Sequence, residues 1–209
     1  MTGFISDRGF FLQDVRLVAR RLLGMHFVRI LGNGTRIAGR IVETEAYAEK
    51  DDPASHSYRG RTPRNAVMFM PGGHLYVYFT YGMHYCCNVV TGPEGRGEAV
   101  LIRALEPLEG VDSMIRQRYG QDEITRERFG NLTNGPAKLC AAMGIDRNMN
   151  GTDLLSGECR IEAGIAVPDE QIVSAPRIGI GRGGDLLWRY YDSRNTWVSK
   201  RRTVNKNET

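Results

Sequence analysis

The sequence predicts an α+β fold, formed as one domain with a mostly antiparallel curved sheet, flanking helices and a protruding β-hairpin. Its 209 residues are 41% hydrophobic and 25% charged, which is the composition of an ordinary globular domain. The strand-like segments follow one another through short turns, as antiparallel strands can and parallel strands cannot. No internal repeat or linker interrupts the chain, so we expect residues 1–199 to form a single domain.

The first expected elements are an amphipathic helix and a hairpin. Apolar residues recur at helical spacing over residues 14–23, and Gly24 follows where a helix would end. Residues 26–31 and 36–47 have the character of strands, and the Gly-Asn-Gly sequence between them suits a tight turn.

Three more strands are expected in the middle of the chain, over residues 75–80, 84–90 and 99–105. The first two enclose Gly82, the one residue there that is built for a turn, which places a hairpin tip near it. The large Tyr81 beside it then has the shape of a wedge that can enter a minor groove and replace a base in the stack. A continuous core strand with a glycine bulge is the alternative.

The later elements are two helices and two closing strands. Residues 113–129 are polar and helix-prone, although Gly120 could divide them, and residues 137–143 form a short helix with a proline near its first turn. Residues 177–180 and 186–199 are expected to close the sheet as strands.

The charge and cysteine pattern bounds the class of protein. The formal net charge is +4, and residues 200–209, which we expect to form a basic and flexible tail, carry most of it. The four cysteines form no disulfide framework, no apolar run could span a membrane and no signal peptide is evident. We therefore expect reduced thiols and a protein that is not secreted, located in the cytoplasm, or in the nucleus if the source is eukaryotic.

A metal site is not expected. The candidate ligands His56, His74, His84 and Cys86 have none of the usual ligand spacings.

The segment from Pro53 to Pro93 has no acidic residue. It does contain arginines and five tyrosines, a combination that suits phosphates and bases. A buried tyrosine-rich sheet with a basic loop in front of it would have the same composition, so the segment alone does not decide between the two interpretations.

The strand that ends in E-T-E-A-Y carries two carboxylates. Alternation places Glu43, Glu45 and Tyr47 on the same face as Ile37 and Ile41. Acids that continue an apolar row must reach the rim of the sheet or be partly buried, and a buried carboxylate is a candidate proton acceptor. The spacing leaves open a strand that runs into solvent, a one-base mechanism and a mechanism with two carboxylates.

Five blocks in the same order together resemble the alkyladenine (3-methyladenine) DNA glycosylase family. They are Arg40–Tyr47, His56–Asn65, Met68–His84, Leu101–Gly110 and Asn134–Cys140, and the resemblance covers most of the chain. It implies a monofunctional enzyme of base-excision repair that uses no cofactor.

The implied enzyme acts on double-stranded DNA as a monomer, with no membrane partner. It flips alkylated or deaminated purines out of the duplex and hydrolyses the N-glycosidic bond. The expected substrates are 3-methyladenine, 7-methylguanine, hypoxanthine and ethenoadenine.

The resemblance also implies residue roles. Glu45 is the general base that activates water, and Arg103 and the main chain near Ile178 hold that water. Tyr47, His56 and Tyr78 surround the flipped base, Asn88 discourages guanine, and Tyr81 intercalates. The implied DNA contacts are Arg61, Arg64, Met83 and Lys138.

Three alternatives stay open. Lys50, five residues past Glu45, could form a Schiff base and make the enzyme bifunctional. The chain could instead bind damaged DNA without turnover. It could also be an O-glycoside hydrolase that uses Glu43 and Glu45, although neither tryptophan lies near these acids in the sequence.

Overall fold

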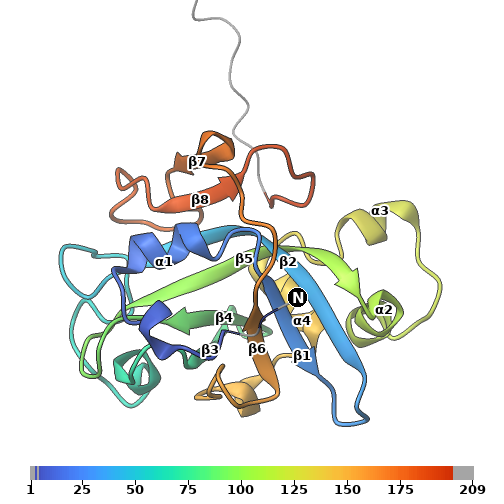
Figure 1. Cartoon of the computed structure of the whole chain (residues 1–209), viewed down its shortest axis with the longest axis horizontal. Helices are drawn as coiled ribbons and strands as arrows, with labels where there is room; N and C mark the ends of the chain where they lie inside the picture. The colour runs from blue at the N-terminus through green and yellow to red at the C-terminus, as the bar shows by residue number, and fades with distance from the viewer. Residues whose placement is uncertain (1–2, 4, 200–209) are drawn as a thin grey trace, which may run out of the picture.

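The fold is built on one antiparallel sheet of eight strands. The computed structural model describes residue 3 and residues 5–199, and the tail expected at residues 200–209 lies outside the described part of the chain. The strand order is β3-β4-β5-β2-β1-β6, with β8 paired to β2 and β7 paired to β8 (Figure 1). The strands are β1 (His26–Ile30), β2 (Arg36–Tyr47), β3 (Leu75–Thr80), β4 (His84–Val90), β5 (Ala99–Glu109), β6 (Cys159–Glu162), β7 (Ile172–Ala175) and β8 (Arg189–Asp192).

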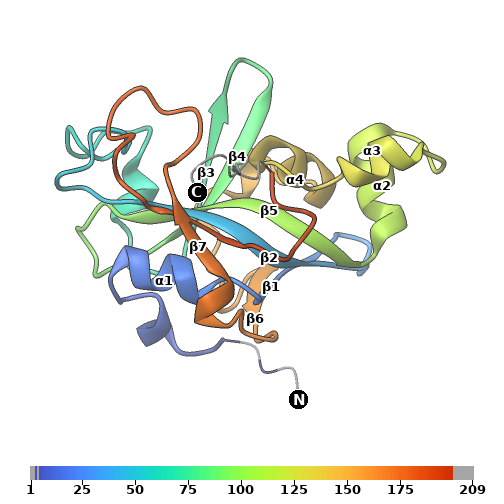
Figure 2. The same cartoon turned by 90° about the horizontal axis from the view of Figure 1, so that it is seen from above.

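Four short α-helices flank the sheet in the described residues: α1 (Val15–Arg21), α2 (Val111–Tyr119), α3 (Arg126–Gly130) and α4 (Pro136–Met143). Asp14 caps α1 by accepting hydrogen bonds from the next turn. Helix α1 packs against β2 and β5, and α4 packs against β4, β5 and α2 (Figure 2). The apolar faces of α1 and α4 belong to one core cluster together with the inner face of the sheet.

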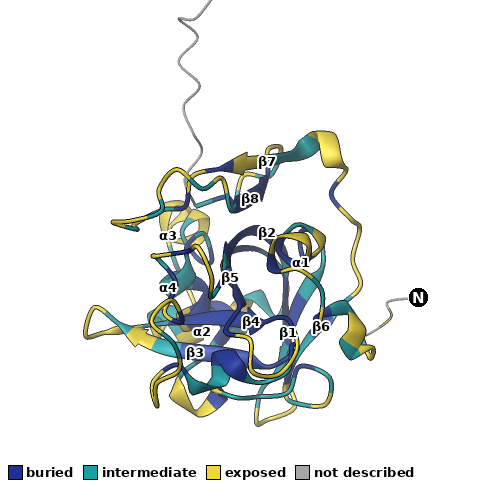
Figure 3. Cartoon of the chain, turned by 90° about the vertical axis from the view of Figure 1, so that its left-hand side faces the viewer, coloured by how far each residue is buried: buried dark blue, intermediate teal, exposed yellow. Residues whose placement is uncertain are grey.

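The long strand β2 is the centre of the sheet. It pairs with β5 along one edge, whereas its other edge pairs first with β1 and then with β8. The sheet curls around the buried core, which Figure 3 shows end-on. The predicted α+β class, with a curved antiparallel sheet in a single domain, is therefore confirmed.

Strict alternation along β2 is a wrong prediction. Ile41 and Ala46 pack into the same core cluster although they are five residues apart, while Val42 belongs to a separate cluster under β7 and β8. The β2–β5 register shifts between Ile41 and Glu43 and again between Glu43 and Thr44. These β-bulges turn the acids away from the row of Ile37 and Ile41, as bulges beside functional sites often do.

The turn between β3 and β4 is confirmed as a hairpin tip, so the continuous strand with a glycine bulge is excluded. Tyr81 and Gly82 both have positive φ, at 51° and 69°, and the two strands pair from Leu75↔Val89 to Thr80↔His84. The hairpin projects from the body of the molecule, as Figure 2 shows.

The prediction was wrong for the first closing strand. Residues 177–180 form a loop, because β7 ends at Ala175 before a proline and the next two residues use their polar groups elsewhere. Arg177 pairs with a buried carboxylate, and the amide of Ile178 donates to a side chain rather than to a strand.

The remaining elements agree with expectation only in part. Of residues 186–199 only β8 is a strand, since the side chains of Asp192 and Asn195 accept hydrogen bonds from amides two residues on and turn the chain. Gly120 adopts a left-handed conformation and ends α2, so the division of residues 113–129 at this glycine is confirmed and the segment contains two helices. The edge strand β6, which pairs with β1, was not predicted.

Two further findings concern the described residues as a whole. No helix among them combines the length and apolarity needed to cross a bilayer. All four cysteines are buried and free.

Candidate active site

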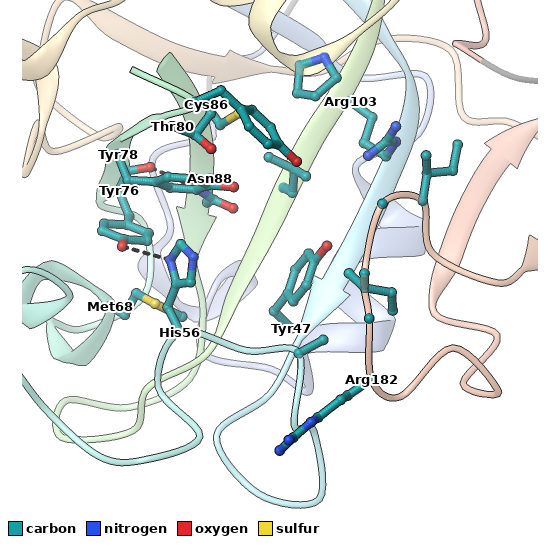
Figure 4. Close-up of a pocket in the computed structure, with 18 of the residues that line it drawn as sticks. Tyr47, His56, Met68, Tyr76, Tyr78, Thr80, Cys86, Asn88, Arg103 and Arg182 are labelled. Atoms are coloured by element: carbon teal, nitrogen blue, oxygen red, sulfur yellow. Dashed lines mark hydrogen bonds between the residues drawn. The ribbon is translucent and has the colours of Figure 1, made fainter. Parts of the chain in front are cut away.

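A cavity of about 540 Å³ lies between the β3–β4 hairpin, the end of β2 and the loop that follows β7 (Figure 4). This volume is in the range of small-molecule binding sites. Of the residues implicated by the sequence, its walls include Tyr47, His56, Arg64, Tyr78, Tyr81, Asn88, Arg103 and Ile178. The fold thus collects residues from four separated segments around one hollow.

Glu45 lies directly behind one wall of this cavity, and its side chain is fully buried. Oε2 accepts hydrogen bonds from the Tyr47 hydroxyl at 2.8 Å and from Nη1 of Arg103 at 3.2 Å. Oε1 accepts a hydrogen bond of 2.7 Å from the Ile178 amide. Since all three donor residues line the cavity, the carboxylate is held at its edge in one orientation.

Arg103 connects the two carboxylates of β2. Its Nε donates to Glu43 at 2.9 Å while its Nη1 reaches Glu45. Burial opposes the charged form of Arg103, but Glu45 and Glu43 outweigh it and raise the pKa of the guanidinium. Arg103 therefore stays a fixed cation beside the cavity.

Glu43 has no freedom to act in the cavity. It is fully buried and accepts hydrogen bonds from Arg103, from Nε of Arg189 at 2.6 Å, and from the amide and hydroxyl of Ser199. With this many donors, Glu43 serves as a structural anion that orients Arg103.

A cluster of three rings, those of His56, Tyr76 and Tyr78, forms the cavity wall opposite Tyr47 and Arg103 (Figure 4). The rings of His56 and Tyr78 meet edge-on with centroids 4.5 Å apart, and Tyr76 lies 5.5 Å from Tyr78. Burial raises the pKa values of Tyr47 and Tyr78 and raises that of Tyr76 to about 12, so all three hydroxyls stay protonated. Flat apolar rings with polar edges suit a planar heterocycle.

His56 presents a neutral imidazole to the cavity. Its Nδ1 lies 3.0 Å from the Tyr76 hydroxyl. Burial lowers the pKa of His56 below its ordinary value, and the positive charge of Arg64 lowers it further. One ring nitrogen is engaged by Tyr76, so the other is left to meet a ligand edge (Figure 4).

Asn88 is oriented by the main chain. Its Nδ2 donates one hydrogen bond to the carbonyl oxygen of Tyr76 at 3.1 Å, which fixes the orientation of the amide at the cavity wall. The pairing of Tyr76 with Asn88 and of Tyr78 with Cys86 brings β3 and β4 together at this wall. Burial raises the pKa of the Cys86 thiol to about 11, which keeps it protonated and unreactive.

The expected DNA contacts lie in segments that also contribute residues to the cavity wall. Tyr81 and Met83 at the hairpin tip are 83% and 71% exposed. Arg64 lines the cavity and donates to the carbonyl oxygen of Phe79, while Arg61 is exposed nearby in sequence. Lys138 is held by the side-chain oxygens of Asn131 and Asn134, near the cavity-lining Pro136.

Three features of the site escaped the sequence-based assignment. Tyr76 lines the cavity, and its position two residues before Tyr78 on a strand was the signal that could have placed it on the same wall. Arg182 lines it from the glycine-rich loop. The buried pair of Asp52 and Arg177 has no signal in one sequence, because 125 residues separate its members.

The geometry gives little support to Lys50 as a nucleophile. Lys50 is exposed in the turn after β2 and does not line the cavity. In the part of the chain that the structure describes, no group of three or more His, Cys, Asp or Glu residues could hold a metal ion.

Comparison with known proteins gives consistent matches. The family model for methylpurine-DNA glycosylase matches residues 9–196. A relative from Carboxydothermus hydrogenoformans is 53% identical over 198 residues, covering 94% of this chain and all of the relative. A relative from Burkholderia lata is 50% identical over 200 residues, covering 94% and 92%. One from Bacillus mycoides is 44% identical over 202 residues, covering 91% and 97%. All three are provisionally named 3-methyladenine DNA glycosylases.

Proposed function

The chain belongs to the methylpurine-DNA glycosylase family and is a DNA glycosylase, and we propose that it removes damaged purines from duplex DNA with a water molecule activated by Glu45. The observation that carries this proposal is the buried Glu45 carboxylate, held by three donors at the wall of a cavity lined with aromatic rings. The family supplies the class of reaction, and the geometry supports the assignment of roles.

The flipped base is proposed to stack between Tyr47 and Tyr78. A cationic base such as 3-methyladenine or 7-methylguanine gains about 0.5 to 2 kcal/mol from each aromatic face. Neutral bases such as hypoxanthine and ethenoadenine gain less, so their selection relies on the edge contacts of His56. Asn88, which lines the cavity, is proposed to crowd the exocyclic amine of guanine.

Tyr81 is proposed to replace the base in the stack. Flipping costs a few kcal/mol, and a ring inserted into the gap offsets part of that cost. The exposed ring at the tip of a projecting hairpin is suited to this role. Arg61, Arg64, Met83 and Lys138 are proposed to hold the flanking backbone, which positions the nucleotide without reading its sequence.

The proposed chemical step uses the same residues. Water forms a bond to C1′ while the N-glycosidic bond breaks, the departing base takes the bonding electrons, and Glu45 accepts the proton of the water. The negative charge of Glu45 also stabilises the cationic sugar in the transition state. Arg103 is proposed to hold the water. Since the amide of Ile178 already donates to Glu45, the carbonyl oxygen of Ile178 is the main-chain group that is proposed to hold the water as well.

The alternatives are disfavoured on specific grounds. An O-glycoside hydrolase needs two available carboxylates. The Glu43 carboxylate is not available, because it accepts hydrogen bonds from Arg103, Arg189 and Ser199. A lyase needs Lys50 at C1′, and this side chain is exposed away from the cavity lining. A protein that binds damaged DNA without releasing base is distinguished by the base-release experiment below.

Release of free base from duplexes that each carry one lesion tests the proposal. We expect free hypoxanthine and an abasic site, with no covalent complex trapped by borohydride. Binding without base release would indicate a damaged-DNA binder. A trapped adduct that is lost in Lys50→Ala would indicate a lyase.

A further inference from the structure

Arg177 joins three segments of the chain beneath the cavity. Its side chain is fully buried, and it forms a bidentate ion pair with Asp52, at 2.7 Å from Nη1 and 2.6 Å from Nη2. Nη1 also donates to the carbonyl oxygen of Ala46 at 2.9 Å. The guanidinium therefore links the end of β2, the loop after β2 and the loop after β7.

Asp52 is itself fixed by the main chain. Its two oxygens accept hydrogen bonds from the amides of Ala48 at 3.1 Å and Ala54 at 3.2 Å. Burying two charges is costly unless the pair is well hydrogen-bonded. Here both oxygens of Asp52 and three of the five N–H groups of Arg177 have partners, whereas Nε of Arg177 is buried without one. Such a pair has one geometry, so it can act as a fixed reference point for its neighbours.

The pair of Asp52 and Arg177 contacts or adjoins two groups of the proposed site, the Tyr47 ring and the Ile178 amide. The guanidinium carbon of Arg177 lies 4.5 Å from the centroid of the Tyr47 ring. Because Tyr47 lines the cavity and Arg177 is fully buried, the guanidinium covers the side of the ring that is turned away from the cavity. The residue after Arg177 is Ile178, whose amide donates to Glu45.

We propose that Arg177, oriented by Asp52, is a positioning residue for base release that sets both the Tyr47 ring and the Ile178 amide. The inference rests on the proposed function and deepens it. Lysine cannot take this role, because a single ammonium group lacks the planar fork that a bidentate pair requires. Displacements of about 1 Å from such a change can slow a reaction about 100-fold.

The charge of Arg177 also acts on specificity. The negative faces of an aromatic ring attract cations, and Arg177 already occupies one face of the Tyr47 ring. A cationic base on the other face is therefore attracted less strongly, and it is also repelled by the positive charge of Arg177. Arg177 therefore reduces the advantage of a cationic base over a neutral one. Removing the charge should raise the ratio of 7-methylguanine release to hypoxanthine release about two- to fivefold.

Single-turnover base release by the full chain tests both parts. The variants are Arg177→Lys, which keeps the charge, Arg177→Gln, which removes it, and Asp52→Asn, which removes the partner. The matched control is Arg8→Lys, because Arg8 also pairs with an aspartate and donates to a carbonyl oxygen, at Asp153 and Gly72 away from the cavity. Melting temperatures and dissociation constants for hypoxanthine duplexes are measured for every variant.

The expected result is a 10- to 100-fold slower single-turnover rate in Arg177→Lys and Asp52→Asn, with a much smaller loss of DNA affinity and little effect of Arg8→Lys. The release ratio should rise in Arg177→Gln relative to Arg177→Lys. Wild-type rates in both Arg177→Lys and Asp52→Asn, or an unchanged ratio in Arg177→Gln, overturn the proposal. If the Arg177 variants do not fold, Asp52→Asn decides the positioning role by its rate alone. A wild-type chain that releases no base contradicts the proposed function instead.

Discussion

The hydroxyl of Tyr47 donates a hydrogen bond of 2.8 Å to Oε2 of Glu45, two residues earlier on the same strand. One side chain thus contributes an aromatic face to the cavity and a donor to the proposed general base. Stacking and chemistry are coupled through this single residue, and the two contributions can be separated by substitution.

Tyr47→Phe keeps the ring and removes the donor. A hydrogen bond to a charged group contributes about 1.5 to 3 kcal/mol, so we expect single-turnover release to slow about 10- to 100-fold. DNA affinity should change little. The matched control is Tyr119→Phe, which removes a hydroxyl bonded to the carbonyl oxygen of Arg128 outside the cavity. Equal rates in the two variants contradict the coupling.

Tyr81→Ala tests the wedge. Since the side chain is 83% exposed, the free energy of unfolding should change by less than about 0.5 kcal/mol. Base release from duplex DNA should fall, while release from single-stranded DNA should fall much less because there is no stack to fill. Ile165→Ala, at a residue that is 82% exposed, is the control. Equal losses on both forms of DNA count against intercalation.

His56 should titrate below its ordinary pKa of 6.5. Burial and the charge of Arg64 both disfavour the imidazolium, so between pH 6.5 and the lowered pKa the unfolded chain binds more protons than the native one. The contribution of this group to stability is therefore lost as the pH falls through that window. An NMR titration, with His56→Gln to assign the resonance, measures the midpoint. Arg64→Gln should raise it, and a midpoint above 6.5 contradicts the environment described.

Arg64→Gln should also weaken the salt dependence of DNA binding. Each phosphate contact to duplex DNA contributes a slope of about −0.9 to the plot of log affinity against log salt concentration. We expect the slope to become less steep by about one contact. Arg21→Gln, at an exposed residue of α1 far from the hairpin, should leave the slope unchanged. The same slope in Arg64→Gln and wild type excludes a phosphate contact.

Local sequence signals were sufficient for much of the fold. Gly82 located the hairpin tip because a glycine between two strand-like runs rich in aromatic residues suits a turn. The first helix and the strand over residues 36–47 followed from their periodicity, and the observed bounds agree closely.

The failures arose where tertiary contacts override periodicity. The paired bulges near Glu43 and Arg103 depend on the register between β2 and β5, which alternation within one strand does not reveal. Residues 177–180 look like a strand, but their polar groups bind Asp52 and Glu45, which lie more than 120 residues away in the chain. The strand pattern and the hairpin tip indicated Glu45 and Tyr81, whereas the residue roles as a set came from family resemblance and stay predictions.

The role of Glu45 is tested most directly by single-turnover release of hypoxanthine from a duplex by Glu45→Gln. Glutamine keeps the shape of the side chain but cannot accept the proton of the water, and Glu109→Gln, at a partly exposed residue paired with Arg36, is the matched control. We predict that Glu45→Gln binds the duplex with nearly wild-type affinity and releases base at least about 100-fold more slowly. Release at the wild-type rate would contradict the assignment of Glu45 as the general base.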